Sequence, residues 1–465
     1  MALSAEYFEK LRILLGGSDF ESIQQGLALI EALDISESDF ITLISMIGNS
    51  EVDLQPNQRI LEEKFTFLHY HDARKLAIWV LYTWIRVVPH RSVDVPTLSI
   101  FQIPYHELPE DFSHFGHLRE VNMRYGEWVE FPKWLLCMTK LESLDISDNF
   151  ISFIPDLRHM KHLRTLNISG MKLCEIPDWV GDLPALTSLY VRNNRCTALP
   201  DNIAKLTQLT NLDIADNALT SISSIPELTS LTHLNVSNNA LKNLPPISSL
   251  TRLERLSIDT NQLTELPIGI ETCTSIVHLN LSHNHFTSLP DVLWKMTSLV
   301  SLDVSHNSIV ELSSSIGELH NLERLKLEHN SLTALPEELF SVDLGYIRFN
   351  HNQLTVVPEQ IANLKRLNFL PLDDNLFSTL PDSIGTMTNI YRLGIENNQF
   401  TTFPMVLLQL TQLTQLSIRG NKITRLPIEI AKMPVLDEIF VTGNPIEKED
   451  IAAIYEANED IWFYT

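Results

Sequence analysis

Four histidines stand at nearly regular intervals in the middle of this 465-residue sequence, at steps of 23, 23 and 22 residues. They are His283, His306, His329 and His351. Imidazole titrates nearest to neutral pH of all side chains and binds divalent metals, so a row of four could sense pH or hold a metal ion. The alternative, which we favour, is that each imidazole only covers a recurrent turn. Close rings would then resist double protonation and stay mostly neutral at pH 7.

A second group combines positive charge with aromatic rings further along the chain. Its members are Arg324, Lys326, Tyr346, Arg348, Phe369, Arg392 and Arg419. Arginine and aromatic residues are enriched at the positions that carry most of the binding free energy of protein interfaces. Glu328, Asp373, Asp374 and Glu396 lie near them, so the group is mixed in sign. We predict that the seven residues bind a protein partner; the alternative is an ordinary solvated surface.

Sequence motifs for catalysis are missing. The chain has no GxxxxGK[ST] phosphate loop, no HExxH or GxSxG motif, and no GxGxxG after a strand. The four cysteines, Cys137, Cys174, Cys196 and Cys273, lack the CxxC spacing of zinc sites. We interpret them as reduced residues in or near the core, with Cys174 and Cys196 as the one pair that could be neighbours. The sequence therefore predicts no enzyme, no cofactor and no metal centre.

The elements that position these side chains follow from a repeat. Segments such as LESLDISDN (141–149), LTHLNVSNN (231–239) and LVSLDVSHN (299–307) share the frame LxxLxLxxN, which continues as xLxxLPxxIxxLxx. Asn ends the frame at positions 149, 194, 217, 239, 261, 284, 307, 330, 352, 375, 398, 421 and 444. Ile103, Gly126 and Met171 take that place in three further units, which gives sixteen units at steps of 22 or 23 residues.

The frame itself predicts the local structure. Two leucines two residues apart point to one face of a short strand, and the residue between them points to the other face. Strands of successive units should stack into a parallel sheet on which equivalent positions form rows. The recurrent Asn is expected inside the turn, where its amide can donate to and accept from buried backbone groups. The proline of LP suits a segment that has left the sheet.

With this pattern the chain resembles the leucine-rich repeat family of the 23-residue type, which includes intracellular Ras-group and bacterial proteins. The resemblance covers residues 95–446. It implies an α/β solenoid in the form of a right-handed horseshoe, with a parallel sheet on the concave face, that binds other macromolecules. For this chain we therefore predict a non-catalytic scaffold that binds a protein on its concave face.

The two ends fall outside the repeat. Residues 1–94 have helical spacing and predict an all-α helical domain that caps the solenoid, with or without a partner surface of its own. The alternative function is a bacterial effector or an immune-type sensor, in which the repeats target a partner and this helical block carries the activity. Residues 447–465 predict a short C-terminal capping helix.

Charge and compartment narrow the class of partner. The chain has 34 Lys and Arg against 58 Asp and Glu, and its formal charge of −24 repels nucleic-acid phosphates and anionic membranes. Glu6 and Glu9 stand where a secretory signal carries positive charge, and the longest apolar run, Leu76–Ile85, is about half a membrane span. We expect a cytoplasmic protein; the alternative is a bacterial protein exported without a cleavable signal.

Overall fold

The computed structural model describes residues 116–465 and, before them, Lys10, Leu11, Leu14, residues 25–27, residues 97–100, Ile103 and Tyr105. The helical domain predicted at residues 1–94 lies outside the described residues, apart from the first six of these, which are helical. The chain divides into two compact units, Met1–Asn217 and Ala218–Thr465.

A three-residue strand begins six residues before the Asn position of every repeat. The strands of the first unit are β1 (Thr97–Ser99), β2 (Glu120–Asn122), β3 (Ser143–Asp145), β4 (Thr165–Asn167), β5 (Ser188–Tyr190) and β6 (Asn211–Asp213). Those of the second unit are β7 (His233–Asn235), β8 (Arg255–Ser257), β9 (His278–Asn280), β10 (Ser301–Asp303), β11 (Arg324–Lys326), β12 (Tyr346–Arg348), β13 (Phe369–Pro371), β14 (Arg392–Gly394), β15 (Gln415–Ser417) and β16 (Glu438–Phe440). Each strand buries its middle residue, as the alternation of the frame predicts.

Neighbouring strands pair in parallel and in chain order, with equivalent repeat positions opposite each other. In the first unit Leu166 pairs with Leu189, for example, and in the second Leu302 pairs with Leu325. The second unit contains two ladders, one that ends at β12 and one that begins at β13. Pro371 of β13 has no backbone N–H to donate, which explains the interruption. The predicted parallel sheet is confirmed within each ladder and stops at this proline.

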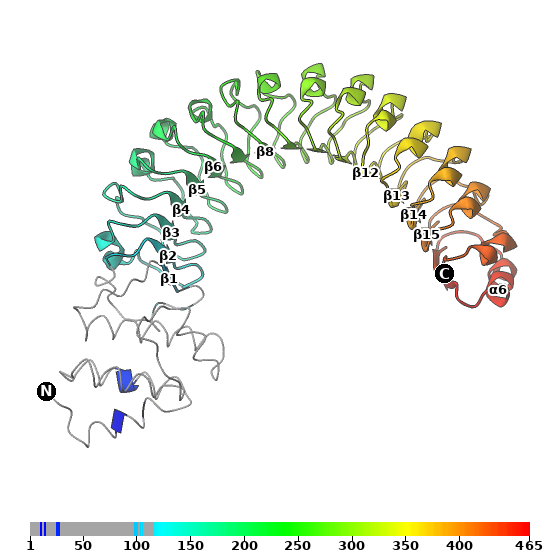
Figure 1. Cartoon of the computed structure of the whole chain (residues 1–465), viewed down its shortest axis with the longest axis horizontal. Coiled ribbons are helices and arrows are strands. Elements are labelled where there is room, and N and C mark those ends of the chain that lie inside the picture. The colour runs from blue at the N-terminus through cyan, green and yellow to red at the C-terminus, as the bar shows by residue number, and fades with distance from the viewer. Residues whose placement is uncertain are drawn as a thin grey trace. The chain divides into compact units, whose positions relative to one another are not determined.

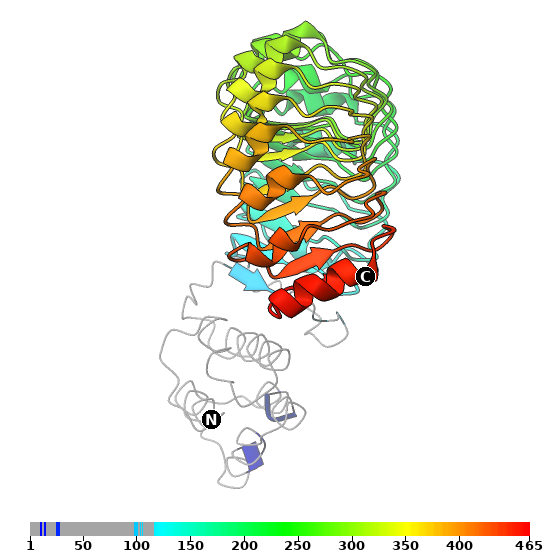
Figure 2. The same ribbon diagram turned by 90° about the vertical axis from the view of Figure 1, so that its right-hand side faces the viewer.

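Short 3-10 helices cover the opposite side of the repeats. They are η4 (Lys133–Cys137), η5 (Asp178–Asp182) and η6 (Asp201–Lys205) in the first unit, and η7 (Ile225–Glu227), η8 (Ile270–Thr272), η9 (Asp291–Lys295), η10 (Ser314–Glu318), η11 (Glu337–Ser341), η12 (Glu359–Asn363), η13 (Asp382–Thr386), η14 (Met405–Gln409) and η15 (Ile428–Lys432) in the second. The proline of LP directly precedes helices such as η11 and η12. In the second unit the strands line the inner side of the curve and these helices the outer side (Figure 1), where they stack in a column (Figure 2).

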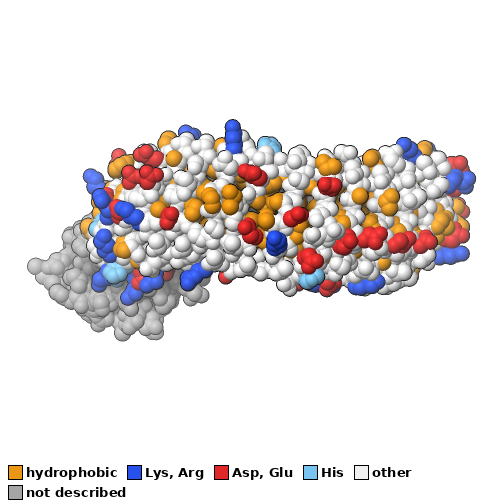
Figure 3. Space-filling view, turned by 90° about the horizontal axis from the view of Figure 1, so that it is seen from above, with side chains coloured by type: hydrophobic (Ala, Val, Ile, Leu, Met, Phe, Trp, Pro, Cys, Tyr) orange, Lys and Arg blue, Asp and Glu red, His pale blue; other side chains and the backbone are white. Residues whose placement is uncertain are grey.

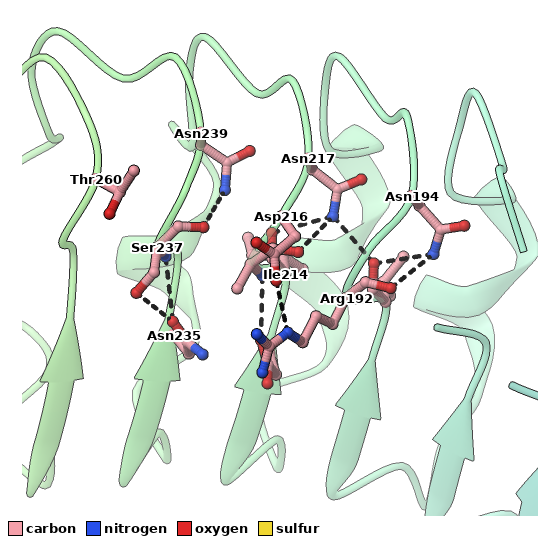
Figure 4. Close-up of polar contacts among 12 residues, drawn as sticks. Arg192, Asn194, Ile214, Asp216, Asn217, Asn235, Ser237, Asn239 and Thr260 are labelled. Carbon is pink, nitrogen blue, oxygen red and sulfur yellow. Dashed lines mark hydrogen bonds and ion pairs between the residues drawn. The ribbon is translucent and has the colours of Figure 1, made fainter. Parts of the chain in front are cut away.

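The recurrent Asn joins the turns of successive repeats. Asn194 Oδ1 accepts the backbone N–H groups of Met171 and Leu173 at 3.1 and 2.9 Å. Its Nδ2 donates to the carbonyls of Ile168 and Val191 at 2.9 and 3.0 Å. Figure 4 shows this amide and that of Asn217 directed at the turns. The predicted structural role of the Asn is confirmed, and Met171 occupies the place that the frame assigned to it.

The residue before each Asn has a left-handed backbone. Its φ lies between 50 and 58° wherever it is not glycine, from Tyr125 to Asn397. Asn, Asp, His and Gly adopt this region most readily, whereas β-branched residues such as Thr260, which stands in this column, adopt it rarely. This preference accounts for the histidines and favours their role in the turn.

At its C-terminal side the second unit is closed by α6 (Lys448–Ala457), which is the predicted helix, and by β17 (Trp462–Tyr464), which pairs with β16 and was not expected. Asp450, 8% exposed, accepts two bonds from the Arg425 guanidinium and one from the Leu426 N–H, each of 2.8 Å. The hydrogen bonds from Arg425 are the main cause that lowers the pKa of Asp450. Among the described residues no helix is long and apolar enough to cross a membrane.

All four cysteines are free thiols. Cys196 and Cys273 are buried, and burial raises the pKa of these thiols to about 12 and about 11. Cys137 and Cys174 are exposed, which corrects the interpretation that all four lie in or near the core. Cys137 ends the helix η4 and Cys174 lies between β4 and η5, so each side chain can turn outward without interrupting the apolar rows of the strands.

Candidate partner-binding surface

All seven residues predicted to bind a partner belong to the second unit and to the strand face away from the buried leucines. Arg324 lies opposite Tyr346, and Lys326 lies opposite Arg348. On the second ladder Phe369 lies opposite Arg392, and Arg419 follows β15 by two residues. We call these seven residues the arginine–aromatic surface. The structure brings them together as two groups, one on β11 and β12 and one from β13 to the end of β15.

Three arginines of this surface lie over aromatic rings. The guanidinium carbon is 5.5 Å from the ring centre of Tyr346 for Arg348, 5.6 Å from that of Phe369 for Arg392, and 4.5 Å from that of Phe440 for Arg419. Contacts of this kind hold the guanidinium plane while its edge N–H groups stay able to donate. Phe440 is absent from the seven predicted residues, although the register places it opposite Ser417 on the same face.

The basic groups of the surface differ in how they are paired. Lys326 forms an ion pair with Asp303 at 2.8 Å, which contributes to the raised pKa of the lysine. Arg324, Arg348, Arg392 and Arg419 form no ion pair with any described residue. The Nε atoms of Arg348 and Arg419 are moreover buried without a hydrogen-bond partner. These arginines thus retain donors that the fold itself does not satisfy.

A hollow of about 230 Å³ opens on the second ladder. It is lined by Phe369, Asp373, Arg392, Leu393, Gly394, Glu396, Gln415, Ser417, Arg419 and Phe440. Gly394 makes room for the Asp373 carboxylate, since a Cβ at this position would collide with it. Asp373 and Glu396, which were expected only as acids near the positive charges, form part of the wall of this hollow.

The acids of this hollow are held within the fold. Asp373 Oδ1 accepts the backbone N–H of Glu396 at 2.7 Å, and a Glu396 oxygen accepts the hydroxyl of Ser417. Burial raises the pKa of Asp373 to about 7, and the nearby charges of Glu396 and Asp374 raise it as well. Asp373 therefore changes its charge near neutral pH, which no feature of the sequence indicated.

A second hollow of about 590 Å³ lies beside β11 and β12. Its lining includes Arg324, Lys326 and Tyr346 of the arginine–aromatic surface, together with Glu323 and Arg366. Arg366 lies 3.5 Å from Glu323, so this pair offers little free charge. Arg324 is the group of this hollow that has no ion pair with a described residue.

The strand face of the first unit pairs its arginines internally. Arg124 Nε donates to Asp148 at 2.8 Å, and Arg192 Nε donates to Asp216 at 2.6 Å, a contact drawn in Figure 4. Each carboxylate belongs to the residue 24 positions further along the chain. The acidic character predicted for the earlier strands is thus partly neutralised by arginines of the same face.

The four histidines form a continuous stack of rings. The ring centres of His283, His306, His329 and His351 are 3.9, 4.0 and 4.0 Å apart in order, with interplanar angles of 11 to 18°. Burial is the main cause that lowers the pKa of His306 and of His329, and neighbouring imidazoles lower both further. At the end of the stack His351 Nε2 lies 3.3 Å from Asp374.

Stacked rings are poorly arranged for shared metal coordination, because the nitrogen lone pairs lie in the ring planes and point along parallel directions. Among the described residues no group of three or more His, Cys, Asp and Glu side chains is gathered to hold a metal ion. The geometry therefore favours a pH response of these imidazoles over a metal site.

The outer surface of the second unit is acidic. Asp or Glu stands in the first turn of η9, η11, η12, η13 and η15. Figure 3 shows a row of acidic side chains on this side, over the half nearer the C-terminus. The net charge of −24 therefore coexists with a strand face that carries unpaired arginines.

One more hollow, of about 670 Å³, lies in the first unit among Tyr105, Trp128, Phe131 and Trp134. These aromatic residues are not among those predicted to bind a partner. We assign this hollow no ligand.

Comparisons with known proteins agree with the repeat. A model described as a leucine-rich repeat region matches residues 152–268, and a leucine rich repeat model matches residues 251–309 and 320–377. No curated protein sequence matches the chain significantly.

Several solved structures are similar. A leucine-rich repeat protein of Leptospira interrogans is 29% identical, with a TM-score of 0.68, over 80% of this chain and 90% of that one. The ectodomain of the Arabidopsis thaliana receptor kinase GASSHO1/SCHENGEN3, solved with CASPARIAN STRIP INTEGRITY FACTOR 2, is 25% identical with a TM-score of 0.63, over 76% and 44% of the two chains. The functional domain of InlJ from Listeria monocytogenes, 22% identical with a TM-score of 0.60 over 71% and 74%, shares the fold.

Proposed function

Because the chain is a leucine-rich repeat protein, we propose that it is a non-catalytic scaffold that binds a protein partner with the arginine–aromatic surface of its second unit. The observation that carries this proposal is that four arginines on one strand face form no ion pair with a described residue, although the chain has a large excess of acids. A charged group that leaves water for an interface needs a counter-charge, and a partner could supply it.

The size and composition of the surface support this role. From β11 to β16 there are five steps of about 4.8 Å, so this face is about 24 Å long and can supply the central part of an interface of about 800 Å² per partner. Aromatic residues and arginines are the types that dominate such interfaces. The GASSHO1/SCHENGEN3 ectodomain, a similar repeat structure, was solved with a bound factor.

The proposal includes a cytoplasmic location, where the four free cysteines would stay reduced. The alternative function, an effector or immune-type sensor, assigns the activity to residues 1–94, which lie outside the described residues. In that case as well the repeats would bind the partner.

Affinity capture from the native source with the purified full-length chain, followed by mass spectrometry, tests the proposal. The variant Arg324→Ala, Tyr346→Ala, Arg348→Ala and Phe369→Ala should lose the partner that the wild-type chain recovers. A matched control on the first unit changes four strand-face residues, namely Ser143→Ala, Asn167→Ala, Tyr190→Ala and Asn211→Ala. Both variants should retain the wild-type circular dichroism spectrum. Equal recovery by wild type and the second-unit variant would contradict the proposal.

A second candidate function of this unit is a response to pH, which the ring stack favours. Protonation of adjacent imidazoles about 4 Å apart adds like charges at short range, so the stack should charge only on acidification. Partner affinity should then differ between about pH 7.5 and 5.5, on either side of the ordinary histidine pKa. The variant His306→Asn and His329→Asn, which suits the left-handed backbone, should lose this difference. A wild-type affinity that is flat over this range would exclude the response.

A further inference from the structure

The hollow above Gly394 joins the two arginines at the C-terminal end of the surface. Arg392 lines it from β14 and lies over Phe369, and Arg419 lines it from the turn after β15 and lies over Phe440. Two guanidinium groups and two aromatic rings thus belong to one small space.

The arginine donors of this space lack partners within the fold, whereas its carboxylates accept hydrogen bonds from the fold. Neither arginine has an ion pair with a described residue, and Arg419 Nε is buried without a partner. By contrast, Asp373 accepts the Glu396 N–H and Glu396 accepts the Ser417 hydroxyl. The hollow therefore needs an acceptor from outside more than it needs another donor.

A carboxylate side chain fits these requirements. Its two oxygens match the donor fork of a guanidinium, and such charge-assisted bonds are among the strongest in proteins. The rings of Phe369 and Phe440 offer apolar contact to the methylene groups of a glutamate. A volume of about 230 Å³ is ample for one such side chain.

Resting on the proposed function above, we propose that this hollow receives a glutamate or aspartate side chain from an acidic segment of the protein partner, with Arg392 and Arg419 as its counter-charges. The acidic outer surface of the unit repels an acidic segment of the partner, so that segment is expected to bind only at the strand face. The partner is thus a protein with an exposed acidic stretch.

The test uses blocked, fluorescently labelled peptides and the full-length chain. A hexaglutamate peptide, acetylated and amidated at its ends, is titrated by fluorescence anisotropy at about 50 mM salt, where screening is moderate. Peptides of six glutamines, of six lysines and of six phosphoserines serve as alternative probes. The double variant Arg392→Gln and Arg419→Gln is compared with Arg255→Gln. Arg255 lies on the exposed face of β8 and also forms no ion pair with a described residue.

Hexaglutamate should bind more tightly than hexaglutamine, and the double variant should weaken it at least about tenfold while Arg255→Gln changes it less than about twofold. In NMR spectra of the wild-type chain, the arginine Nε–H signal that Arg419→Gln lacks should also shift when hexaglutamate is added. Tighter binding of hexalysine, or equal binding by wild type and the double variant, overturns the proposal. Tighter binding of the phosphoserine peptide through the same arginines overturns the choice of carboxylate.

Failure of this proposal can be told apart from failure of the proposed function. If the double variant still captures the native partner while the four-alanine variant at Arg324, Tyr346, Arg348 and Phe369 does not, the scaffold function stands and the hollow is not the carboxylate site. If both variants capture the partner as wild type does, the proposed function itself fails.

Discussion

The same repeat position carries an arginine in both units, and the residue 24 positions further along determines whether that arginine forms an ion pair. Arg192 of the first unit pairs with Asp216, whereas the position 24 residues after Arg419 of the second unit is Gly443, which has no side chain. Arg419 instead lies over Phe440 with its Nε unpartnered. The two strand faces therefore share a backbone and differ in whether their arginines are neutralised within the fold.

The largest expected effect tests the shared backbone. Asn149→Ala in the first unit and Asn284→Ala in the second each remove an amide that bonds buried backbone groups, at 3.0 Å to Gly126 N and at 3.0 Å to Leu263 N respectively. Each should cost about 3 kcal/mol of stability, because several buried polar groups lose their partners together. Chemical denaturation measures the loss, and the exposed Asn363→Ala is the control. A clearly smaller cost in one unit would show that the turns are not equivalent.

A substitution in the second unit can recreate the pairing of the first. Gly443→Asp places a carboxylate where Asp216 stands relative to Arg192, so it should occupy Arg419 and weaken hexaglutamate binding about tenfold. Gly443→Asn is the matched control, since it introduces an uncharged side chain of the same size and shape at the same φ of 79°. Similar affinities of the two variants would mean that Arg419 does not bind the peptide.

Asp373 predicts a pH-dependent difference in stability. Since burial raises its folded-state pKa from 3.8 to about 7, its contribution is fully present below about pH 4 and is lost as the pH rises through 7. Asp373→Asn should therefore become more stable than wild type by about 1 kcal/mol or more at pH 8, with little difference at pH 4. Thermal unfolding across this range measures it. A difference that does not grow between pH 4 and 8 would show that Asp373 ionises normally.

The smallest effect is expected in the first unit. Asp216→Asn removes the carboxylate partner of Arg192, whose side chain is 59% exposed, so the stability should fall by less than about 1 kcal/mol. Hexaglutamate binding to the full-length chain should stay within about twofold of wild type, because the substitution leaves the hollow lined by Arg392 and Arg419 unchanged. A large gain in binding would show that the peptide also binds at Arg192.

The repeat made most of the fold predictable. Leucine spacing located every strand from β1 to β16, and the Asn frame placed even Met171 correctly, because buried polar turns accept few alternatives. Comparison of equivalent repeat positions also predicted that the seven residues of the arginine–aromatic surface lie on one face of the strands. The exposed thiols of Cys137 and Cys174, the interruption at Pro371 and the strand β17 were not predicted, since the repeat frame describes what the units share and each of these is a departure of a single unit or of the end.

The sequence by itself determined which residues share a row, because the strand period and the repeat length fix that geometry. Only the tertiary structure decided which charges meet. Asp216 forms an ion pair with Arg192, and the ring of Phe440 lies under the guanidinium of Arg419. The carboxylate of Asp373 lies against Gly394, where burial raises its pKa to about 7. Pairing and burial depend on distances of a few ångströms between side chains of different repeats, and a one-dimensional pattern does not specify them.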